Sequence, residues 1–266
     1  MRLIASDIDG TILGHDGKIS ARTVRAFAAA AEAGIDIVFV TGRPPRWLAP
    51  IREQIGHLGT VICSNGALTY DLAEEKVIDS QVLGWDTVNS VRSIIMGIAQ
   101  EPYFALESLT GFHVEEGFLR GQVVARGVVP VDALTPDMAQ AGIVKMLAVL
   151  HAGTADEFMK LVAPAVSSLI TVTHSAPELA LLEMGPLGVN KAVTLARYAA
   201  ARGIDAADVV AFGDMPNDIE MLGWAGAGYA MASGHPGAIA AAALQAPRFE
   251  DDGVAQVIEA RLGAAG

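Results

Sequence analysis

The sequence predicts an α/β fold: a parallel sheet covered by helices on both faces, with an α+β module inserted into it. Strand-like and helix-like segments alternate over the first 63 residues and again after residue 188, which implies parallel strands joined by right-handed crossovers. Between about residues 83 and 185 this alternation gives way to runs of short strands. Several strands outside the insertion end in a glycine-containing turn with a polar side chain, where open α/β sheets bind ligands.

The N-terminal segment is predicted to form three strands separated by two helices. In order, its elements are a strand at 2–7, a flap at 10–18, a helix from a cap at Ser20 to about residue 33, a strand at 35–40, a helix at 45–55 and a strand at 60–63. Ser20 is a favoured N-cap, and Gly34 is a favoured residue after a helix end. This βαβαβ order predicts a Rossmann-like, three-layer core.

The insertion and the C-terminal segment follow different patterns. The insertion contains a helix from residue 86, strand-like pieces at 103–107, 112–115 and 122–125, a further segment at 144–150, a helix at 155–161, and strands at 168–174 and 179–183. After residue 188 come a helix to residue 202, a strand at 209–212, a helix at 218–224, a strand at 227–231 and terminal helices. We therefore expect a discontinuous core of residues 1–82 and 186–266 and an inserted α+β domain of residues 83–185.

The composition of the chain indicates which classes of binding partner and which cellular compartment to expect. The chain of 266 residues has a formal net charge of −12, whereas nucleic acids and anionic membranes are bound by clustered lysine and arginine. We therefore expect no nucleic acid and no membrane as partner, and the oligomeric state stays open. The single cysteine, Cys63, permits no intrachain disulfide and follows two apolar residues, as a buried core residue does. No apolar segment suits a signal peptide or a membrane span, so we expect a cytoplasmic protein.

The turn after the first strand is the most informative segment, because Asp7 and Asp9 stand there just before Gly10. Alternation along an extended chain puts the two carboxylates on the same side. Like charges at that separation repel, so such a pair fits a site where a cation lies between them or where one carboxyl stays protonated to act as an acid. Taken alone, the segment is better explained as a polar turn.

Three further segments weigh against that simpler explanation, at 38–43, 188–191 and 209–218. If they meet the first turn at one edge of the sheet, the four together form a site for phosphoryl transfer. Asp7 would then attack phosphorus to form an aspartyl-phosphate. Asp9 would protonate the leaving alkoxide and later activate the water that hydrolyses the intermediate.

The same arrangement predicts a Mg²⁺ site. Asp7, Asp214 and the main-chain carbonyl of Asp9 supply the hard oxygen ligands that Mg²⁺ prefers. Asp218, four residues after Asp214, would reach the metal through a water or pair with Lys191. Lys191 would neutralise charge on a bound phosphate.

Thr41 and the amide of Gly42 would donate hydrogen bonds to phosphate oxygens. Each residue also has a simpler explanation. These are a helix cap for Thr41, a solvated side chain for Arg43, an exposed lysine for Lys191, a surface acid for Asp218 and an Asn-Gly turn for Asn65. The occurrence of the whole set in one chain favours the site.

The four segments resemble the motifs of the haloacid dehalogenase (HAD) superfamily, specifically its Cof-type (type IIB) phosphatases with a large inserted cap. The matching residues are 7–11, 41–43, 188–191 and 213–218, and residues 64–67 are similar to a segment near the substrate entrance of that subgroup. Ala192 stands where the subgroup usually has glycine, and Met215 and Pro216 fill a variable part of the fourth motif. Neither departure removes a chemical group.

The resemblance implies a Mg²⁺-dependent phosphatase of small phosphorylated metabolites, often sugar phosphates, whose inserted cap selects the substrate. The implied roles are nucleophile for Asp7, general acid and base for Asp9, catalytic cation for Lys191, metal ligands for Asp7, Asp9, Asp214 and Asp218, and substrate binding for Thr41, Gly42, Arg43, Asn65 and Asn217. A phosphomutase with the same groups is one alternative. A signalling receiver domain is another, although a receiver has no acid two residues after its phosphorylated aspartate.

Overall fold

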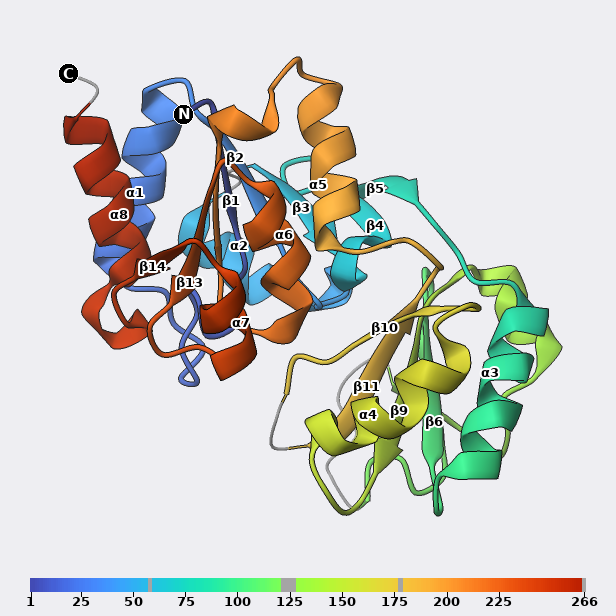
Figure 1. Cartoon of the computed structure of the whole chain (residues 1–266). Coiled ribbons are helices and arrows are strands. Elements are labelled where there is room, and N and C mark those ends of the chain that lie inside the picture. The colour runs from blue at the N-terminus through green and yellow to red at the C-terminus, as the bar shows by residue number, and fades with distance from the viewer. Residues whose placement is uncertain (57–58, 121–127, 177–178, 265–266) are drawn as a thin grey trace. The chain divides into compact units, whose positions relative to one another are not determined.

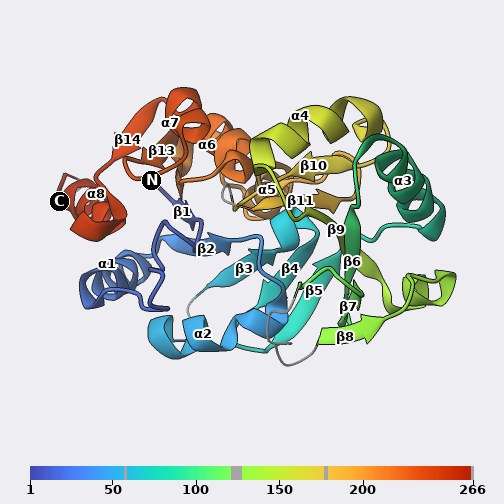
Figure 2. The same ribbon diagram turned by 90° about the horizontal axis from the view of Figure 1, so that it is seen from below.

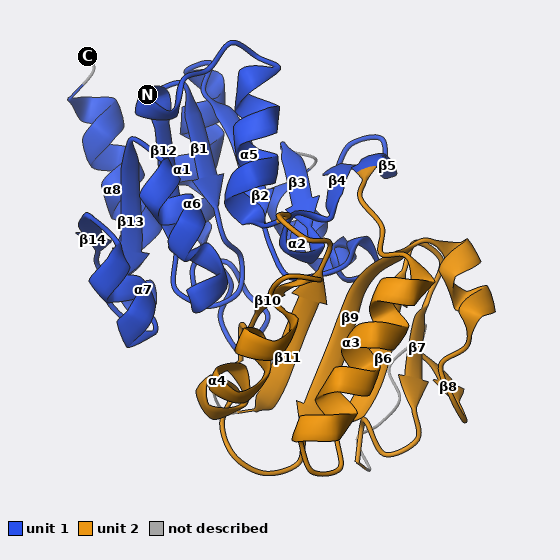
Figure 3. Ribbon diagram, turned by 45° about the vertical axis from the view of Figure 1, so that its right-hand side comes forward, with its two compact units in different colours: residues 1–79, 190–266 blue, residues 80–189 orange. Residues whose placement is uncertain are grey.

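The computed structural model describes residues 1–56, 59–120, 128–176 and 179–264. The chain divides into two compact units, unit 1 with residues 1–79 and 190–266, and unit 2 with residues 80–189 (Figure 3). The predicted insertion, 83–185, starts three residues later than unit 2 and ends four residues earlier. Each unit has its own sheet and helices, which are labelled in Figures 1 and 3.

Unit 1 is built on an eight-stranded sheet with the order β14-β13-β12-β1-β2-β3-β4-β5. Its strands are β1 (Leu3–Ser6), β2 (Asp36–Val40), β3 (Thr60–Cys63), β4 (Leu68–Asp71), β5 (Lys76–Ser80), β12 (Val209–Gly213), β13 (Ala227–Met231) and β14 (Leu244–Ala246). The strands from β14 to β3 are parallel, as predicted, whereas β4 runs antiparallel to β3. The neighbours β12, β1, β2 and β3 therefore present their carboxyl ends at one edge.

Helices cover both faces of this sheet (Figure 2). They are α1 (Ala21–Glu32), α2 (Ala49–Ile55), α5 (Lys191–Ala200), α6 (Ile219–Trp224), α7 (Pro236–Ala241) and α8 (Gly253–Gly263). On one face α1 lies beside α8, and Phe27 of α1 packs on Phe39 of β2 with ring centroids 5.2 Å apart. On the other face Leu3 and Ala5 of β1 belong to a core shared with α5 and α6. Ile4, which alternates with them along β1, is fully buried too, so the strand is covered on both faces.

Unit 2 is an α+β module with a six-stranded sheet of order β10-β11-β9-β6-β7-β8. Its elements are α3 (Trp85–Ile98), β6 (Tyr103–Ser108), β7 (Phe112–Glu115), β8 (Val128–Val131), β9 (Ile143–Leu150), α4 (Ala155–Val166), β10 (Thr171–Thr173) and β11 (Ala180–Gly185). All neighbours in this sheet run antiparallel except β7 and β8. Ile95 of α3 and Phe158 of α4 share one core with Phe104 and Met146 of the sheet, so both helices pack on the same face.

Most of the predicted elements are confirmed, including α1 with its cap, where the Ser20 side chain accepts the Thr23 N–H. The continuous helix expected at 45–55 is wrong. A 3₁₀ turn at Pro45–Trp47 precedes α2, because Pro50 has no N–H with which to continue a helix from the preceding turn. The strand expected at 122–125 lies outside the described residues.

Four short strands were not predicted, namely β4, β5, β8 and β14. β5 is exposed and mixes Val77 and Ile78 with charged neighbours, so it has no alternating pattern. β8 contains Pro130, which argues against a strand but is tolerated at a sheet edge. β14 has only three residues and also lies at an edge. Among the described residues, no helix combines the length and the apolar character that crossing a membrane requires.

Candidate active site

A buried ion pair between Asp7 and Lys191 lies at the carboxyl edge of the unit 1 sheet. Asp7 follows β1, and its N–H bonds to the Phe212 carbonyl of β12 at 2.9 Å. Lys191 is the first residue of α5, which the Asn190 side chain caps. The Lys191 side chain is 0% exposed and donates to Asp7 Oδ1 at 2.5 Å and to Asp218 Oδ1 at 2.6 Å. The structure therefore joins the first, third and fourth predicted segments.

Asp214 brings another buried carboxylate to this edge, directly after β12. Thr11 donates its hydroxyl to Asp214 Oδ1 at 3.1 Å. Gly10, at φ 76°, makes this approach possible, because a Cβ there would lie 2.3 Å from Asp214 Oδ2. Sequence reasoning gave Thr11 no role, although its place in the same turn as Asp9 was a usable signal.

Asp218 is fully buried and has both carboxylate oxygens engaged. Oδ1 accepts from Lys191, and Oδ2 accepts the N–H groups of Asp214 and Met215 at 3.0 Å each. Of the two roles predicted for Asp218, pairing with Lys191 is the one that the structure shows. The same carboxylate holds the backbone of Asp214 in place.

The cluster has more negative than positive charge. Oxygens of Asp7, Asp214 and Asp218 lie within 4.8 Å of one another. Lys191 offsets one of these three charges, which leaves two in excess when all are ionised. Burial, reinforced by Asp218, raises the pKa of Asp214 to about 7. Burial also raises the pKa of Asp7 well above its usual value, despite the attraction of Lys191.

Lys191 shows the opposite balance. Burial acts to lower its pKa, but the charges of Asp218 and Asp7 outweigh burial and the net pKa is raised. The ammonium thus stays charged, but three carboxylates share this single positive charge. Hard oxygen donors with an excess of negative charge are the environment that Mg²⁺ favours, so the residues present fit this ion.

Asp9 lies apart from this cluster and pairs with Arg43. The Asp9 side chain is 52% exposed, and Arg43 binds it with two hydrogen bonds, Nε to Oδ2 at 2.7 Å and Nη2 to Oδ1 at 2.5 Å. The bond to Asp9 raises the pKa of Arg43. The sequence placed Arg43 at the substrate and Asp9 at the leaving group, and the structure shows the two side chains bound to each other.

Thr41 and Gly42 follow β2 at the same edge. Thr41 is fully buried, and its hydroxyl oxygen accepts the Arg43 N–H at 3.0 Å, so it does cap a turn. Because the oxygen accepts in that bond, the hydroxyl hydrogen is available for a donor role toward a phosphate oxygen. The structural and the functional interpretations of Thr41 are therefore compatible.

Asn65 and Asn217 contact each other through their side chains. Asn217 Nδ2 donates to Asn65 Oδ1 at 3.0 Å, and Asn217 is 5% exposed. Asn65 belongs to the turn Ser64–Gly66 that follows β3. Every residue predicted for the site, from Asp7 to Asp218, lies in unit 1.

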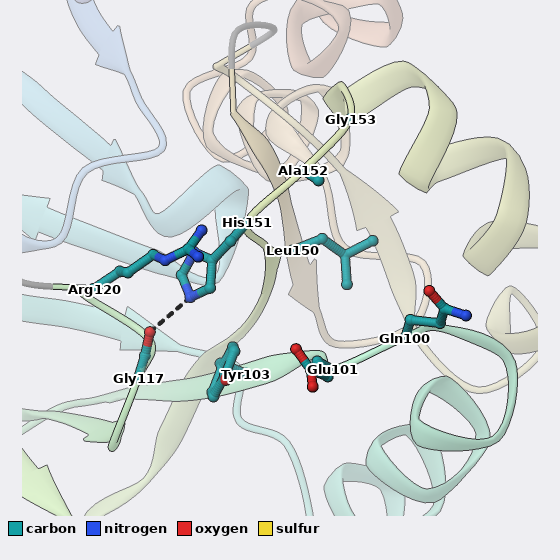
Figure 4. Close-up of a pocket in the computed structure, with 9 residues that line it drawn as sticks. All are labelled: Gln100, Glu101, Tyr103, Gly117, Arg120, Leu150, His151, Ala152 and Gly153. Atoms are coloured by element: carbon teal, nitrogen blue, oxygen red, sulfur yellow. Dashed lines mark hydrogen bonds between the residues drawn. The ribbon is translucent and has the colours of Figure 1, made fainter.

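Unit 2 has a cavity of its own, of about 920 Å³, beside the start of β6 and the end of β9, the two central strands of its sheet (Figure 4). Tyr103 and His151 line it with ring centroids 4.9 Å apart, and a His151 ring nitrogen lies 2.8 Å from the Gly117 carbonyl oxygen. Arg120 also lines this cavity. None of the predicted site residues does so.

The sequence matches the family of haloacid dehalogenase-like hydrolases over residues 4–258. The chain belongs to this family. The resemblance inferred from the four motifs is thereby confirmed, and so is the assignment of the protein as a hydrolase. Membership alone leaves the substrate open, because one fold serves many substrates.

Relatives of this hydrolase cover almost its whole length. YxeH of Bacillus subtilis (strain 168), named as a candidate phosphatase, is 27% identical over an alignment of 272 positions that covers 97% of each chain. A haloacid dehalogenase-like hydrolase from B. subtilis has a similar structure, with a TM-score of 0.83, 20% identity and coverage of 97% and 99%. The sugar phosphatase BT4131, of HAD subclass IIB, gives a TM-score of 0.79 at 21% identity, with coverage of 97% and 98%. These two structures confirm the fold of a Rossmann-like core with an inserted cap.

Proposed function

We propose that this HAD-family hydrolase is a Mg²⁺-dependent phosphatase that hydrolyses small phosphorylated metabolites through an aspartyl-phosphate on Asp7. One observation carries the proposal. Three buried carboxylates face a single buried ammonium at the end of a parallel sheet. A phosphate dianion approaches such a cluster only when a further cation is present. The names of YxeH and BT4131, a candidate phosphatase and a sugar phosphatase, support the reaction class.

The side chains of Asp7 and Asp214 and the main-chain carbonyl of Asp9 would hold the metal. Asp218, whose oxygens are engaged by Lys191 and two backbone N–H groups, would act on it through a water. When bound, Mg²⁺ would neutralise charge on the substrate phosphate and polarise it toward attack.

Asp7 would be the nucleophile because Lys191 holds only one of its oxygens. With Oδ1 accepting from the ammonium, Oδ2 is the oxygen that forms the bond to phosphorus, while the ester bond to the leaving alkoxide breaks. The buried Lys191 would stabilise the charge that develops on the transferred phosphoryl group. Thr41, the amide of Gly42 and Asn217 would donate to its oxygens.

Once released from Arg43, Asp9 would take up a proton from solvent, give it to the leaving alkoxide and then, as a carboxylate again, take a proton from the water that hydrolyses the aspartyl-phosphate. Its two hydrogen bonds with Arg43 must open for either transfer, because both carboxylate oxygens are engaged. A substrate phosphate offers Arg43 another anion to bind, so we propose that substrate binding releases Asp9.

Unit 2 would supply the selectivity among phosphorylated metabolites, with sugar phosphates as the first class to examine.

The test is a panel of phosphorylated metabolites with release of inorganic phosphate as the readout, with Mg²⁺ and with EDTA. We expect Mg²⁺-dependent release from one or more sugar phosphates, and none from the Asp7→Asn variant. Chromatography of the organic product separates a phosphatase from a phosphomutase, which would yield an isomeric phosphate ester. Absence of phosphate release over the whole panel with Mg²⁺, or full release after verified metal removal, would overturn the proposal.

A further inference from the structure

The turn after β3 has an unusual backbone. Ser64 and Asn65 are consecutive residues other than glycine with left-handed conformations, at φ 50° and 55°, and Gly66 follows at φ 104°. Such conformations are disfavoured for residues with a Cβ and persist where the surrounding structure enforces them. The contacts of the turn show what enforces this one.

Backbone contacts tie the turn to two other site segments. The N–H groups of Ser64 and Asn65 donate to the carbonyls of Arg43 and Thr41, both at 3.0 Å. On its other side, the Gly66 carbonyl accepts the hydroxyl of Thr194, in α5, at 2.8 Å. The turn is thus fixed between the end of β2 and the helix that carries Lys191.

Close packing against α5 explains the glycine of the turn. A Cβ at Gly66 would lie 2.3 Å from the carbonyl oxygen of Asn190, the residue that caps α5. The backbone therefore approaches the start of this helix more closely than a side chain would allow.

The Asn65 side chain adds a link to the fourth segment. Its Oδ1 accepts one N–H of the buried Asn217 amide at 3.0 Å. Within the described residues, Asn217 Oδ1 has no hydrogen-bond partner, so the bond to Asn65 is the polar contact that fixes this amide. Rotation of the amide would break that bond, which defines the orientation of the amide group.

We propose that Asn65 is a positioning residue that orients the Asn217 amide to donate its second N–H to the substrate phosphate. The inference rests on the proposed phosphatase function, and it gives Asn65 a role other than the direct substrate contact expected from the sequence. The left-handed turn places Asn65, Asn65 holds Asn217, and Asn217 binds the phosphate. A preorganised donor of this kind stabilises charge in the transition state without rearranging during the reaction.

The variant Asn65→Gly separates this role from a purely structural one. Glycine adopts the left-handed conformation without strain, so a structural role predicts equal or better folding and unchanged activity. Loss of the amide leaves Asn217 unoriented, so the positioning role predicts lower kcat/KM in a well-folded protein. The two roles therefore predict different results for one substitution.

Asp252→Gly is the matched control. Asp252 precedes α8 with φ 57° and ψ 42°, nearly the backbone of Asn65 at φ 55° and ψ 34°. Its side chain makes no capping hydrogen bond. Relief of the same conformation there should leave kcat/KM within about twofold of wild type.

The experiment is a double-mutant cycle of Asn65→Gly and Asn217→Ala, measured as kcat/KM for phosphate release with Mg²⁺. We expect Asn65→Gly to lower kcat/KM by roughly tenfold or more in the wild-type background, because a phosphate donor loses its orientation. In the Asn217→Ala background the same change should alter kcat/KM by less than about twofold. A loss of equal size in both backgrounds, or no loss in either, would overturn the proposal.

A second arm needs no activity and separates this proposal from the proposed function. Urea unfolding is measured without Mg²⁺ for the same four proteins. Asn65→Gly should raise the unfolding midpoint more in the Asn217→Ala background than in wild type, because in that background the substitution relieves the strain without also breaking the bond to Asn217. Equal shifts would show that the pair is not coupled. If the wild type had no phosphatase activity but the shifts were unequal, the proposed function would be rejected, while the coupling of Asn65 to Asn217 would stand.

Discussion

Replacement of Lys191 by methionine, an unbranched apolar side chain of similar length, tests whether the buried cluster is arranged as the structure shows. The Lys191 side chain is fully buried, with Asp7 Oδ1 at 2.5 Å and Asp218 Oδ1 at 2.6 Å from its ammonium. Methionine would fill most of the space but remove the positive charge. Asp7, Asp214 and Asp218 would then face one another without a cation.

The expected loss is large. Removing one partner of a buried ion pair costs about 3–5 kcal/mol, because the remaining charge stays buried and unpaired. Folded proteins are stable by only about 5–15 kcal/mol, so Lys191→Met should remove a substantial part of the free energy of unfolding in the absence of Mg²⁺. Protonation of the carboxylates limits the loss, which ties it to pH.

The sign of the pH effect follows from the carboxyl groups. Burial raises the pKa of Asp7 well above the ordinary value of 3.8 and raises that of Asp214 to about 7. Between the ordinary pKa of 3.8 and the raised pKa of about 7, these carboxyl groups bind more protons in the folded protein than in the unfolded chain. The free energy of unfolding therefore falls as pH rises from about 4 to 7. Without Lys191 the fall should be steeper. The difference in free energy of unfolding between Lys191→Met and wild type should be small near pH 4 and should reach its full size near pH 7.5.

The assay is urea unfolding followed by circular dichroism in EDTA at several pH values, with the m-value checked for a change in cooperativity. The control is Lys191→Met combined with Asp218→Asn, which also removes one negative charge. This double variant should regain part of the lost stability at pH 7.5. A single variant within about 0.5 kcal/mol of wild type at pH 7.5, the range of ordinary surface substitutions, would refute the reasoning. A deficit that does not shrink toward pH 4 would do the same.

Four further predictions concern activity. Asp7→Asn should abolish phosphate release while the circular dichroism spectrum is kept, since an amide cannot attack phosphorus; substantial turnover would exclude Asp7 as nucleophile. Asp9→Asn should slow hydrolysis of alkyl phosphates by roughly a hundredfold. Hydrolysis of an activated aryl phosphate should be slowed less, and an equal loss of rate on both substrates would show that Asp9 is not the acid. Asp214→Asn should raise the Mg²⁺ concentration for half-maximal activity, and an unchanged titration would remove Asp214 from the metal site. Replacement of residues 83–185 by a Gly/Ser linker should keep weak activity on a small activated phosphate and lose discrimination among metabolites. A folded linker protein with an unchanged substrate profile would show that the core selects the substrate.

The sequence was sufficient to place the groups that stand at strand ends. Asp7 and Asp214 each follow a short buried strand, and the parallel order of β12, β1 and β2 necessarily brings those ends together. Lys191 was predicted from the segment 188–191 as one member of the set of four segments, and the structure shows that its capped helix starts at the same edge. Local pattern and topology therefore carry most of the information about this site.

Contacts between side chains could not be predicted in the same way. The pairing of Asp9 with Arg43 joins residues 34 positions apart, and that of Asn65 with Asn217 joins residues 152 positions apart. Strand periodicity indicates on which side of the sheet a residue lies but not which rotamer it adopts. The edge strands β5 and β8 were not predicted for a related reason, since they bury too little apolar surface to show an alternating sequence pattern.

The composition of the buried cluster is itself an argument for function. A structural ion pair needs one partner for each charge, yet Lys191 faces the carboxylates of Asp7, Asp214 and Asp218. The raised pKa values of Asp7 and Asp214 mean that burial outweighs the attraction of Lys191, so the ionised cluster opposes folding. A divalent cation supplies the two positive charges that are missing. The groups that weaken the fold without a metal are thus the ones that would bind Mg²⁺ and phosphate, and the stability and the activity of this enzyme should rise together as Mg²⁺ is added.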